Sequence, residues 1–525
     1  MKRILLLSLL TVSVLASRAQ VSHGGAPLFS QAKSDVAAVA LPTLDNKVFL
    51  QQDMDMVAEA SPMRTGVMQE ADFSNATDGV VSVMDDGTRV WRLKVCSPGA
   101  TAMALFFDTF DIPDGARLFV YDATGDFVIG GFTHQNRQPD GTFYTQAFPG
   151  DVACVEYQEP KSAAGRGKLH LSRVMHGYKD FFAEDGKGAG NCHRNAVCDT
   201  AEWGRQIRSV CKILIYTGSG AYMCSGALVN NTARDKTPYV LTAYHCQDVG
   251  RVTGFMFYFN YQATTCSGST ILTSTQTVSG ADMLAKKSKT DGSDFLLLRL
   301  HEAVPDAYRP YYAGWDRQAV ERPSIGKCIH HPSGDHKRIS TPNSVQINSN
   351  FYKVFWRTGV VEGGSSGSPL FNQSKLIIGQ LYGGTSSCSN QSGYDLYGRV
   401  GVSWLGGGTA STRLQDWLDP INSNVMSIEG LDYSEAGDSA RVVTTNLLHL
   451  YPNPCDGMFR VDVEEIGEAI YHVYDLNGRL VYDGRTVFAT TTQAINLTSL
   501  PYGAYSIELY IADKKYANTV VIKKK

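Results

Sequence analysis

The chain has 525 residues, 43% of them hydrophobic and 19% charged, and its 48 basic side chains nearly balance 51 acidic ones. This composition excludes a disordered chain and argues against electrostatic binding of nucleic acid. At roughly 150 residues per domain, the length predicts three or four domains. The 11 cysteines are too few for a disulfide scaffold, but they fit an oxidised protein with disulfides at selected places.

Residues 1–19 predict a secretory signal peptide. Lys2 and Arg3 precede an apolar run over residues 4–16, and the small residues Ser17 and Ala19 follow it. A membrane anchor is the alternative, but the run is shorter than the roughly 20 residues that span a bilayer. No later apolar run reaches that length. We therefore expect an extracytoplasmic protein without a transmembrane segment.

Residues 20–187 are predicted to form a β-rich region. Short strand-like runs alternate there with turn signals such as residues 113–115. The runs lie at residues 90–95, 102–107, 117–121, 143–148 and 152–157. The pattern favours a small β-sandwich with Cys96 and Cys154 as a plausible internal disulfide. No nucleophile with a neighbouring base stands out in this region.

A polar, glycine-rich stretch at residues 184–190 follows, of a kind that is exposed and easily cut. Further strand-like runs lie at residues 213–216, 227–229, 239–242, 254–261, 295–300 and 376–381. One helix is predicted after them, capped by Ser411 and stopped by Pro420. Because many strands with one terminal helix are typical of a double β-barrel, we expect this fold for residues 188–430.

Residues 431–446 are charged or small and predict a linker. A third β-rich block, residues 447–525, follows it and includes the sequence Tyr451-Pro452-Asn453-Pro454. Composition alone predicts only a small β-sandwich for this block, and leaves carbohydrate binding open as its role.

The strongest chemical signal is the run Gly-Gly-Ser-Ser-Gly-Ser-Pro at residues 363–369. Glycines on both sides of Ser366 let the backbone turn sharply and expose the hydroxyl, which makes this serine a candidate nucleophile. The NH groups of Gly364 and Ser366 can then converge as an oxyanion hole. A flexible Gly/Ser surface loop is the alternative reading of the motif alone.

Two further residues complete a candidate triad. His245 comes directly after an apolar strand and before a cysteine, and Asp294 stands at the start of the apolar run 295–298. A carboxylate buried there needs a partner, and a neutral imidazole NH supplies one. The chain order His, Asp, Ser is that of chymotrypsin-like proteases. Each signal alone is weak, but all three fall in one β-rich region.

The region from about Cys192 to Gly430 resembles the lysyl endopeptidases. The resemblance rests on residues 224–229 (CSGALV), 242–246 (TAYHC), 313–317 (AGWDR), 329–332 (IHHP) and 379–384 (GQLYGG). It implies an all-β chain, with a chymotrypsin-like double β-barrel between an N-terminal, β-sandwich-like propeptide and a C-terminal Ig-like β-sandwich. It also implies a secreted serine endopeptidase that hydrolyses proteins and peptides after lysine and needs no cofactor or metal.

Specificity for lysine has to come from an acid in the primary pocket. Trypsin-like enzymes place that acid six residues before the nucleophile, where this chain has Val360. Asp395 matches the pocket aspartate of the lysyl endopeptidases, with Tyr382, Gly383 and Gly384 on the pocket wall. If Asp395 does not fill this role, another acid, such as Glu362, has to.

One departure concerns Tyr382. The best-known lysyl endopeptidases have a histidine there, and no tryptophan of this sequence can be matched to the one that stacks on it. A trypsin-like protease with a different preferred residue before the cut bond is therefore one alternative. A catalytically inactive, protease-fold adhesin on the cell surface is the other.

The family pattern also implies three disulfides: Cys192 with Cys388, Cys198 with Cys266, and Cys224 with Cys246. Cys211 and Cys328 lie in strand-like runs and are expected to pair or to stay buried, and Cys455 has no evident partner. A metal site at His330 and His331 is not expected, because adjacent histidines project in different directions and no set of ligands completes the site.

If the pocket takes lysine, the enzyme itself can cut between Lys187 and Gly188, which makes the chain a self-processed zymogen. The C-terminal block resembles the sorting domain of type IX secretion substrates of Bacteroidetes. The resemblance rests on residues 451–454 (YPNP), 474–479 (YDLNGR), 500–505 (LPYGAY) and the three final lysines. It implies a passage through the periplasm, contact with the type IX machinery, and release or attachment to the cell surface.

Overall fold

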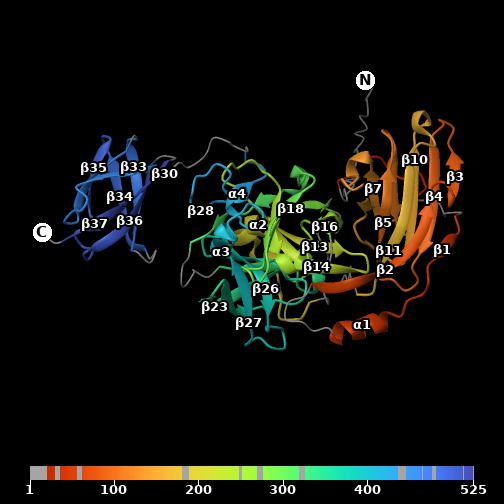
Figure 1. Cartoon of the computed structure of the whole chain (residues 1–525), viewed down its shortest axis with the longest axis horizontal. Coiled ribbons are helices and arrows are strands. Elements are labelled where there is room, and N and C mark those ends of the chain that lie inside the picture. The colour runs from red at the N-terminus through yellow and green to blue at the C-terminus, as the bar shows by residue number, and fades with distance from the viewer. Residues whose placement is uncertain are drawn as a thin grey trace, which may run out of the picture.

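The computed structural model describes residues 21–29, 36–55, 62–179, 182, 189–247, 251–268, 276–318, 326–435, 445–463, 465–475, 480–511 and 514–523. The predicted signal peptide and the predicted processing site, Lys187 and Gly188, lie outside these residues. Three β-rich regions follow one another along the chain (Figure 1). Among the described residues, no helix has the length and apolar character needed to cross a membrane.

The N-terminal region contains eleven strands and the helix α1 (Asn46–Asp55). The strands are β1 (Ala38–Ala40), β2 (Met63–Ser74), β3 (Val80–Val83), β4 (Arg89–Cys96), β5 (Ala102–Asp111), β6 (Arg117–Tyr121), β7 (Val128–Phe132), β8 (Phe143–Tyr144), β9 (Phe148–Pro149), β10 (Val152–Glu159) and β11 (Lys168–Gly177). One sheet has the order β1-β4-β10-β6-β7, with β3 on β4, and the other contains β2, β11, β5, β8 and β9. Large buried side chains from both sheets, such as Trp91 and Phe107, fill the space between them.

Cys96 and Cys154 are both free, so the expected disulfide between them is wrong. The two residues lie on the paired strands β4 and β10, but Cys96 stands opposite Val152, and Cys154 stands opposite Lys94. They are therefore diagonal neighbours, whose Cα atoms in a sheet are about 7–8 Å apart. This separation exceeds what a disulfide spans.

The second sheet of the N-terminal region does not end within that region. Strand β2 pairs with β14 (Gly220–Val229), a strand of the central region, and the two regions thereby share one twelve-stranded sheet. In Figure 1, β2 reaches from the N-terminal region toward β14. The N-terminal region is thus built into the central one through backbone hydrogen bonds.

The central region begins with a barrel of seven strands, called the first barrel here. They are β13 (Val210–Tyr216), β14, β15 (Tyr239–Ala243), β16 (Phe255–Tyr258), β17 (Thr277–Ser279), β18 (Ala281–Lys287) and β19 (Phe295–Leu300). Their order is β17-β16-β13-β14-β15-β19-β18. Every residue of β13 is buried, because one face of this strand packs inside the barrel and the other packs against the N-terminal region.

The second barrel closes on itself. Its strands are β22 (Cys328–His330), β23 (Arg338–Asn348), β24 (Phe351–Thr358), β25 (Pro369–Phe371), β26 (Ile377–Gly384) and β27 (Tyr394–Arg399). The order is β25-β22-β23-β24-β27-β26, and β26 pairs again with β25. The short strands β12 (Arg194–Asn195), β20 (Tyr311–Tyr312), β21 (Trp315–Asp316), β28 (Ser427–Ile428) and β29 (Leu431–Asp432) complete the region. The two barrels confirm the expected chymotrypsin-like architecture.

The central region has three helices among its described residues, whereas the sequence predicted one. They are α2 (Thr200–Ser209), α3 (Val400–Leu405) and α4 (Gln415–Leu418). The predicted helix corresponds to α4, but it begins after Leu414 rather than at Ser411, and no side chain caps it. The apolar spacing of Trp203 and Ile207, both buried, was a signal for α2 that the sequence reading missed.

The C-terminal region is a separate β-sandwich. Its strands are β30 (Thr445–Leu447), β31 (His449–Tyr451), β32 (Met458–Asp462), β33 (Gly467–Tyr474), β34 (Leu480–Phe488), β35 (Thr492–Asn496), β36 (Gly503–Ile511) and β37 (Lys514–Ile522). They form a five-stranded sheet, β30-β37-β36-β33-β34, and a three-stranded sheet, β31-β32-β35. The side chains between the sheets form a core that lies wholly within this region.

Candidate active site

His245 and Asp294 meet on the first barrel. His245 lies in a short 3-10 turn, Tyr244–Gln247, directly after β15, and Asp294 immediately precedes β19, which is paired with β15. The imidazole Nδ1 is 2.8 Å from Oδ2 of Asp294, and the backbone NH of His245 donates to Oδ1 at 3.2 Å. Both side chains are almost fully buried. The carboxylate therefore holds the imidazole on its Nδ1 side.

The backbone of Asp294 has a φ of 55°, in the left-handed region that aspartate tolerates better than most residues. Its carbonyl accepts the NH of Tyr244 at 2.9 Å, which ties the aspartate to the histidine turn a second time. Conformations of this kind are often found at functional sites. Among the described residues, Nε2 of His245 has no hydrogen-bond partner, although it is buried.

The loop that carries Ser366 comes from the second barrel and packs against the first. Ser225 of β14 holds it twice: its NH donates to the carbonyl of Ser366 at 2.7 Å, and its hydroxyl donates to the carbonyl of Gly364 at 2.9 Å. Gly367, with a φ of 81°, lies so close to β15 that a Cβ there would be 2.1 Å from Oγ1 of Thr242. The serine is thus placed beside the strand that leads to His245.

Gly364 has a φ of 88°, and a Cβ at this position would be 2.9 Å from the carbonyl oxygen of His331. Both features require glycine. In the described part of the chain, no backbone acceptor bonds the NH of Gly364 or the NH of Ser366. These two groups are therefore available to a hydrogen-bond acceptor.

Asp395 lies in β27 and is 1% exposed. Its Oδ2 accepts hydrogen bonds from the indole NH of Trp356, at 2.5 Å, and from the hydroxyl of Ser386. No ion pair of Asp395 occurs among the described residues. Burial raises the pKa of this carboxyl to about 6, although the hydrogen bonds from Ser386 and Trp356 oppose the rise. An ammonium group beside it would be strongly stabilised.

Glycines of β26 border this carboxylate. Gly384 is paired with Asp395 across the two strands, and a Cβ there would be 2.5 Å from Oδ1 of the aspartate. Gly383 has a φ of 149°, and the register of the two strands shifts beside it. Val360 is fully buried and its carbonyl accepts the hydroxyl of Ser340 at 2.8 Å. The position six residues before Ser366 is therefore apolar, and Asp395 is the buried carboxylate beside these glycines.

Tyr382 lies on β26, next to the glycines that border Asp395, and also contacts His245. Its ring is edge-to-face with the imidazole of His245 and with the ring of Phe351, at 5.8 Å in each case. The Nζ atom of Lys289 lies 3.9 Å from its centroid. The ring of Tyr382 thus contacts a phenylalanine as well as the imidazole of His245.

Trp356 and Ser386 are site residues that sequence reasoning missed. Trp356 lies on β24, next to β27 in the sheet, and Ser386 lies in the loop after β26. No local motif marks either residue. Only the pairing of Val354 with Asp395 brings the indole to the carboxylate.

Three disulfides are present among the described residues, and they are the pairs that the family pattern implied: Cys192–Cys388, Cys198–Cys266 and Cys224–Cys246. Cys211, Cys328 and Cys455 are free and buried. Cys192, His193 and Cys388 lie close enough together to hold a metal, but both thiols are used in the disulfide. His330 and His331 hydrogen-bond to Ser365 and to the carbonyl of Asp335 instead.

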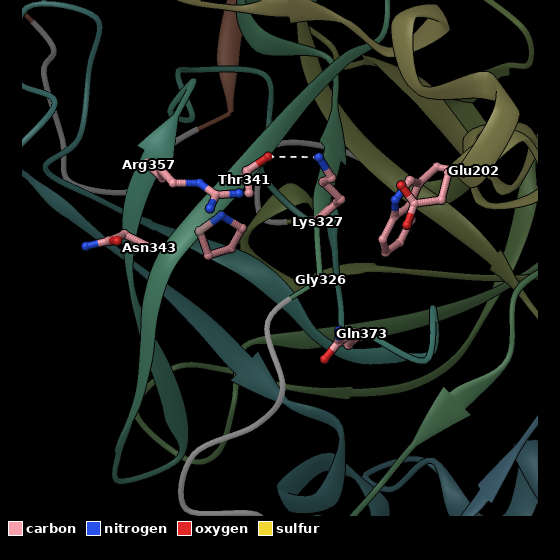
Figure 2. A pocket seen from close by; sticks show the side chains of 9 residues that line it. Glu202, Gly326, Lys327, Thr341, Asn343, Arg357 and Gln373 are labelled. Carbon is pink, nitrogen blue, oxygen red and sulfur yellow. Dashed lines mark hydrogen bonds between the residues drawn. The ribbon is translucent and has the colours of Figure 1, made fainter.

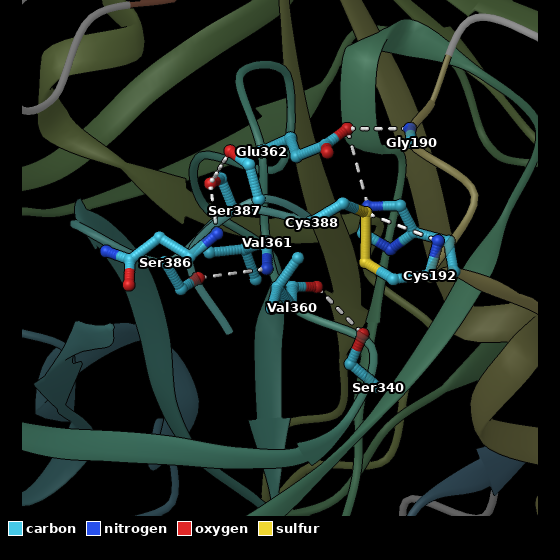
Figure 3. The surroundings of a disulfide bond; sticks show 12 residues. Gly190, Cys192, Ser340, Val360, Val361, Glu362, Ser386, Ser387 and Cys388 are labelled. Carbon is cyan, nitrogen blue, oxygen red and sulfur yellow. Dashed lines mark hydrogen bonds and ion pairs between the residues drawn. A yellow bond between two sulfur atoms is a disulfide. The ribbon is translucent and has the colours of Figure 1, made fainter. Parts of the chain in front are cut away.

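Glu362 belongs to the surroundings of the first of these disulfides (Figure 3). Its carboxylate accepts the NH of Gly190 at 3.2 Å and lies 3.4 Å from Nε2 of His193. Burial alone would raise the pKa of Glu362, but these contacts and the hydroxyl of Ser333 lower it overall. Because its carboxylate holds the start of the central region, Glu362 is not a free acid for the pocket.

A further pocket, of about 260 Å³, lies elsewhere on the central region (Figure 2). Its lining includes Lys327, which bonds Thr341 and Asp199 at 3.0 Å each, and Arg357. None of its lining residues is among the contacts described above for His245, Ser366 or Asp395, so we assign this pocket no role in catalysis.

Comparisons with known proteins agree with this geometry. The family profile "Lysyl endopeptidase, C-terminal domain" matches residues 187–398, and the profile "Secretion system C-terminal sorting domain" matches residues 449–523. A curated lysyl endopeptidase of Pseudomonas aeruginosa is 30% identical over 338 residues, which cover 58% of this chain and 70% of the relative.

Solved structures with similar folds include a variant of human heparin binding protein (CAP37), at 19% identity and a TM-score of 0.31, over 44% of this chain and 96% of the other. A Glu endopeptidase has 17% identity and a TM-score of 0.27, over 40% and 92%. At such scores these likenesses carry no argument. The family rests instead on the curated relative and the two profiles. This secreted or cell-surface chain belongs to the lysyl endopeptidase family and ends in a type IX secretion sorting domain.

Proposed function

We propose that the chain is a serine endopeptidase that cuts after lysine by acyl transfer. Ser366 attacks the carbonyl carbon, and Nε2 of His245 takes its proton and later gives it to the leaving amine. Asp294 holds the imidazole and stabilises its charged form. The NH groups of Gly364 and Ser366 bind the negative oxygen of the intermediate. Water then attacks the acyl group on Ser366, with His245 again taking and returning the proton, and the free serine is restored.

The 2.8 Å contact between His245 and Asp294, next to a serine held against the same barrel, is the observation that carries this proposal. Ser366→Ala should reduce turnover by roughly a factor of 10⁶ and leave the fold intact, because the hydroxyl takes part in chemistry rather than packing. The measurement is kcat on a lysyl ester, with circular dichroism as the control. Substantial residual turnover would remove Ser366 from its role.

We infer that Asp395 is the acid that selects lysine, with Tyr382, Gly383 and Gly384 as the pocket wall. A buried carboxylate with a raised pKa and only neutral partners gains most from a substrate ammonium. Cleavage mapping on a denatured protein tests the preference. Cuts spread over residues other than lysine would favour the alternative, a trypsin-like protease of different preference.

We further propose the organisation of the precursor: signal peptide 1–19, propeptide 20–187, protease 188–430, linker 431–446 and sorting domain 447–525. The enzyme would cut its own chain between Lys187 and Gly188. The mature N-terminus should then read Gly-Ala-Gly-Asn. In a Ser366→Ala protein made alone the precursor should persist, and efficient cutting there would mean that another protease does it.

An inactive adhesin on a protease scaffold is the second candidate. The presence of all three triad residues argues against it, with His245 held by Asp294 at 2.8 Å and Ser366 on a loop held against the same barrel. Labelling by a fluorophosphonate separates the two, since only an activated serine reacts.

A further inference from the structure

Strand β2 of the N-terminal region occupies an edge of the first barrel that leads into the candidate active site. Met63 stands opposite Met223 of β14, Arg64 stands opposite Tyr222, and Val67 stands opposite Gly220. On this edge, β15 pairs with β14 only farther along, at Ala227–Val229. Among the described residues, β2 is therefore what covers the first part of β14. Exposed strand edges are ready templates for another extended segment.

This pairing brings Met63 to the serine loop. A Cβ on Gly363 would be 3.4 Å from Cβ of Met63, and Gly363 directly precedes Gly364 of the oxyanion loop. On the other side, Met223 is followed by Cys224, whose disulfide partner, Cys246, is the residue after His245. The start of β2 thus lies against the loop of the nucleophile and pairs with the strand that is disulfide-linked to the loop of the base.

The chain direction of β2 is that of the leaving half of a substrate. In acyl transfer, the residues after the cut bond depart from the serine with a proton from the imidazole, so they run from the active site outward. β2 does the same: Met63 is at the catalytic end, and the NH of Met68, farther on, donates to the carbonyl of Ser219 at 3.1 Å.

The sequence around this strand resists cutting. Pro62, directly before β2, is buried, and its ring removes the NH and fixes φ. No lysine occurs between Lys47 and Lys94. An enzyme that requires lysine therefore finds no bond to hydrolyse in the segment that approaches its own site.

A second contact area keeps β2 in place. The outward face of the first barrel is apolar, and Leu214 and Met256 are fully buried under the N-terminal region. The hydroxyl of Tyr216 donates to the carbonyl of Thr145 at 3.0 Å, and the NH of Ala147 donates to the hydroxyl of Tyr258 at 2.8 Å. None of these contacts depends on the bond between Lys187 and Gly188.

We propose that β2 is a built-in, non-cleavable inhibitor that fills the leaving-group side of the cleft, and that it stays bound after the chain is cut before Gly188. This inference rests on the proposed protease function. Cutting the linker is then insufficient for activity on proteins, and the N-terminal region has to dissociate or be degraded. Substrates that lack residues after lysine escape the block, because they do not need the edge of β14.

The test compares two substrates on the full chain: a lysine ester with a small leaving group, and a peptide that continues beyond its lysine. Met63→Glu should raise kcat/KM on the peptide by about tenfold or more and leave the ester rate nearly unchanged. Val83→Glu is the matched control, because Val83 belongs to the same region, is 70% exposed and lies on the other sheet. It should change neither rate.

A cross-link covers the case in which Met63→Glu fails to fold. Met63→Cys with Met223→Cys places two thiols on directly opposed residues, and oxidation should trap β2 on β14. The trapped protein should accept the ester and refuse the peptide. If the trapped protein cleaves the peptide, or if the Met63→Glu protein cleaves it no faster than the unaltered protein, the inhibitor role is wrong. If the mature enzyme neither reacts with a fluorophosphonate nor hydrolyses the ester, the proposed protease function itself is wrong.

Discussion

Asp294 and Asp395 are both 1% exposed, but their surroundings differ. Asp294 is 2.8 Å from an imidazole that can carry a positive charge. Asp395 is held by an indole NH and a hydroxyl, and its pKa is raised to about 6 by burial. In the function proposed above, the first carboxylate has its cationic partner within the protein, and the second leaves that place to the substrate. On this proposal, Asp294 serves every substrate and Asp395 selects among them.

The largest effect should come from Asp294→Asn. Without the carboxylate the imidazole loses its fixed orientation and the stabilisation of its charged form, so kcat should fall by about 10⁴. The loss should be equal for a lysyl ester and for a small uncharged ester. Parallel kcat measurements on both substrates decide it, and a loss confined to lysyl substrates would reverse the roles of the two aspartates.

Asp395→Asn should have the opposite profile. The substrate ammonium loses a buried counter-charge, so kcat/KM on lysyl substrates should fall by roughly 10² to 10³, while the uncharged ester is cleaved almost as before. Asparagine has nearly the same shape as aspartate, so this substitution removes the charge without changing the packing. Lysine preference that survives this change would require another acid in the pocket, although Glu362 is already used by Gly190 and His193.

The pH dependence sharpens the same contrast. Because the pKa of Asp395 is about 6 in the folded chain, against an ordinary 3.8, its carboxyl is neutral below that pH, and KM for lysyl substrates should rise as pH falls through 6. The uncharged ester should show no such rise.

The contribution of Asp395 to stability changes with pH in the opposite direction to substrate binding. The folded chain binds the proton of Asp395 more tightly than the unfolded chain, so this group stabilises the fold below pH 4 and loses that contribution as pH rises through 6. Asp395→Asn should therefore gain, relative to the unaltered protein, up to about 3 kcal/mol in free energy of unfolding over this window. Urea unfolding at pH 4 and pH 7 measures it, and a constant difference would contradict the raised pKa.

The smallest effect should come from truncation after Glu435 outside the native host. This cut keeps strand β29, which pairs with β20 of the central region. The C-terminal region has its own core and contributes no residue to the surroundings of either aspartate. Activity on lysyl substrates and the consequences of both substitutions should be nearly unchanged in the truncated chain. In its own host the truncated chain should remain in the periplasm, because the sorting domain is missing. Normal export, assayed by cell fractionation, would refute that role.

The residues of the site that lie in local motifs could be predicted from the sequence. The glycines on both sides of Ser366 indicate this serine. The position of His245 after an apolar strand and that of Asp294 before one indicate the other two residues. Trp356 could not be found in this way, because it reaches Asp395 only through the register of β24 and β27.

The fold shows the same limit. The two barrels and both flanking sandwiches follow from strand and turn patterns, because those patterns are local. The free state of Cys96 and Cys154 depends on a diagonal register that a sequence does not reveal. The sequence of β13 also carried a signal that was not used. In a strand with one face in water, apolar and polar residues should alternate, but every residue of β13 is buried because both of its faces are covered.

The shared sheet also bears on how the chain is made. Gly220 of β14 is 153 residues after its partner Val67 of β2, a long separation for a pairing that completes a barrel edge. Contacts of such range form slowly, and chains fold as they emerge, N-terminal part first. The core around Trp91 and Phe107 consists of residues that precede β13 and β14 in the chain, so we expect it to form first and to present β2 as a template for them. A protease region expressed alone has to close its first barrel without that template, with the outward apolar side chains of β13 exposed to water and prone to aggregation.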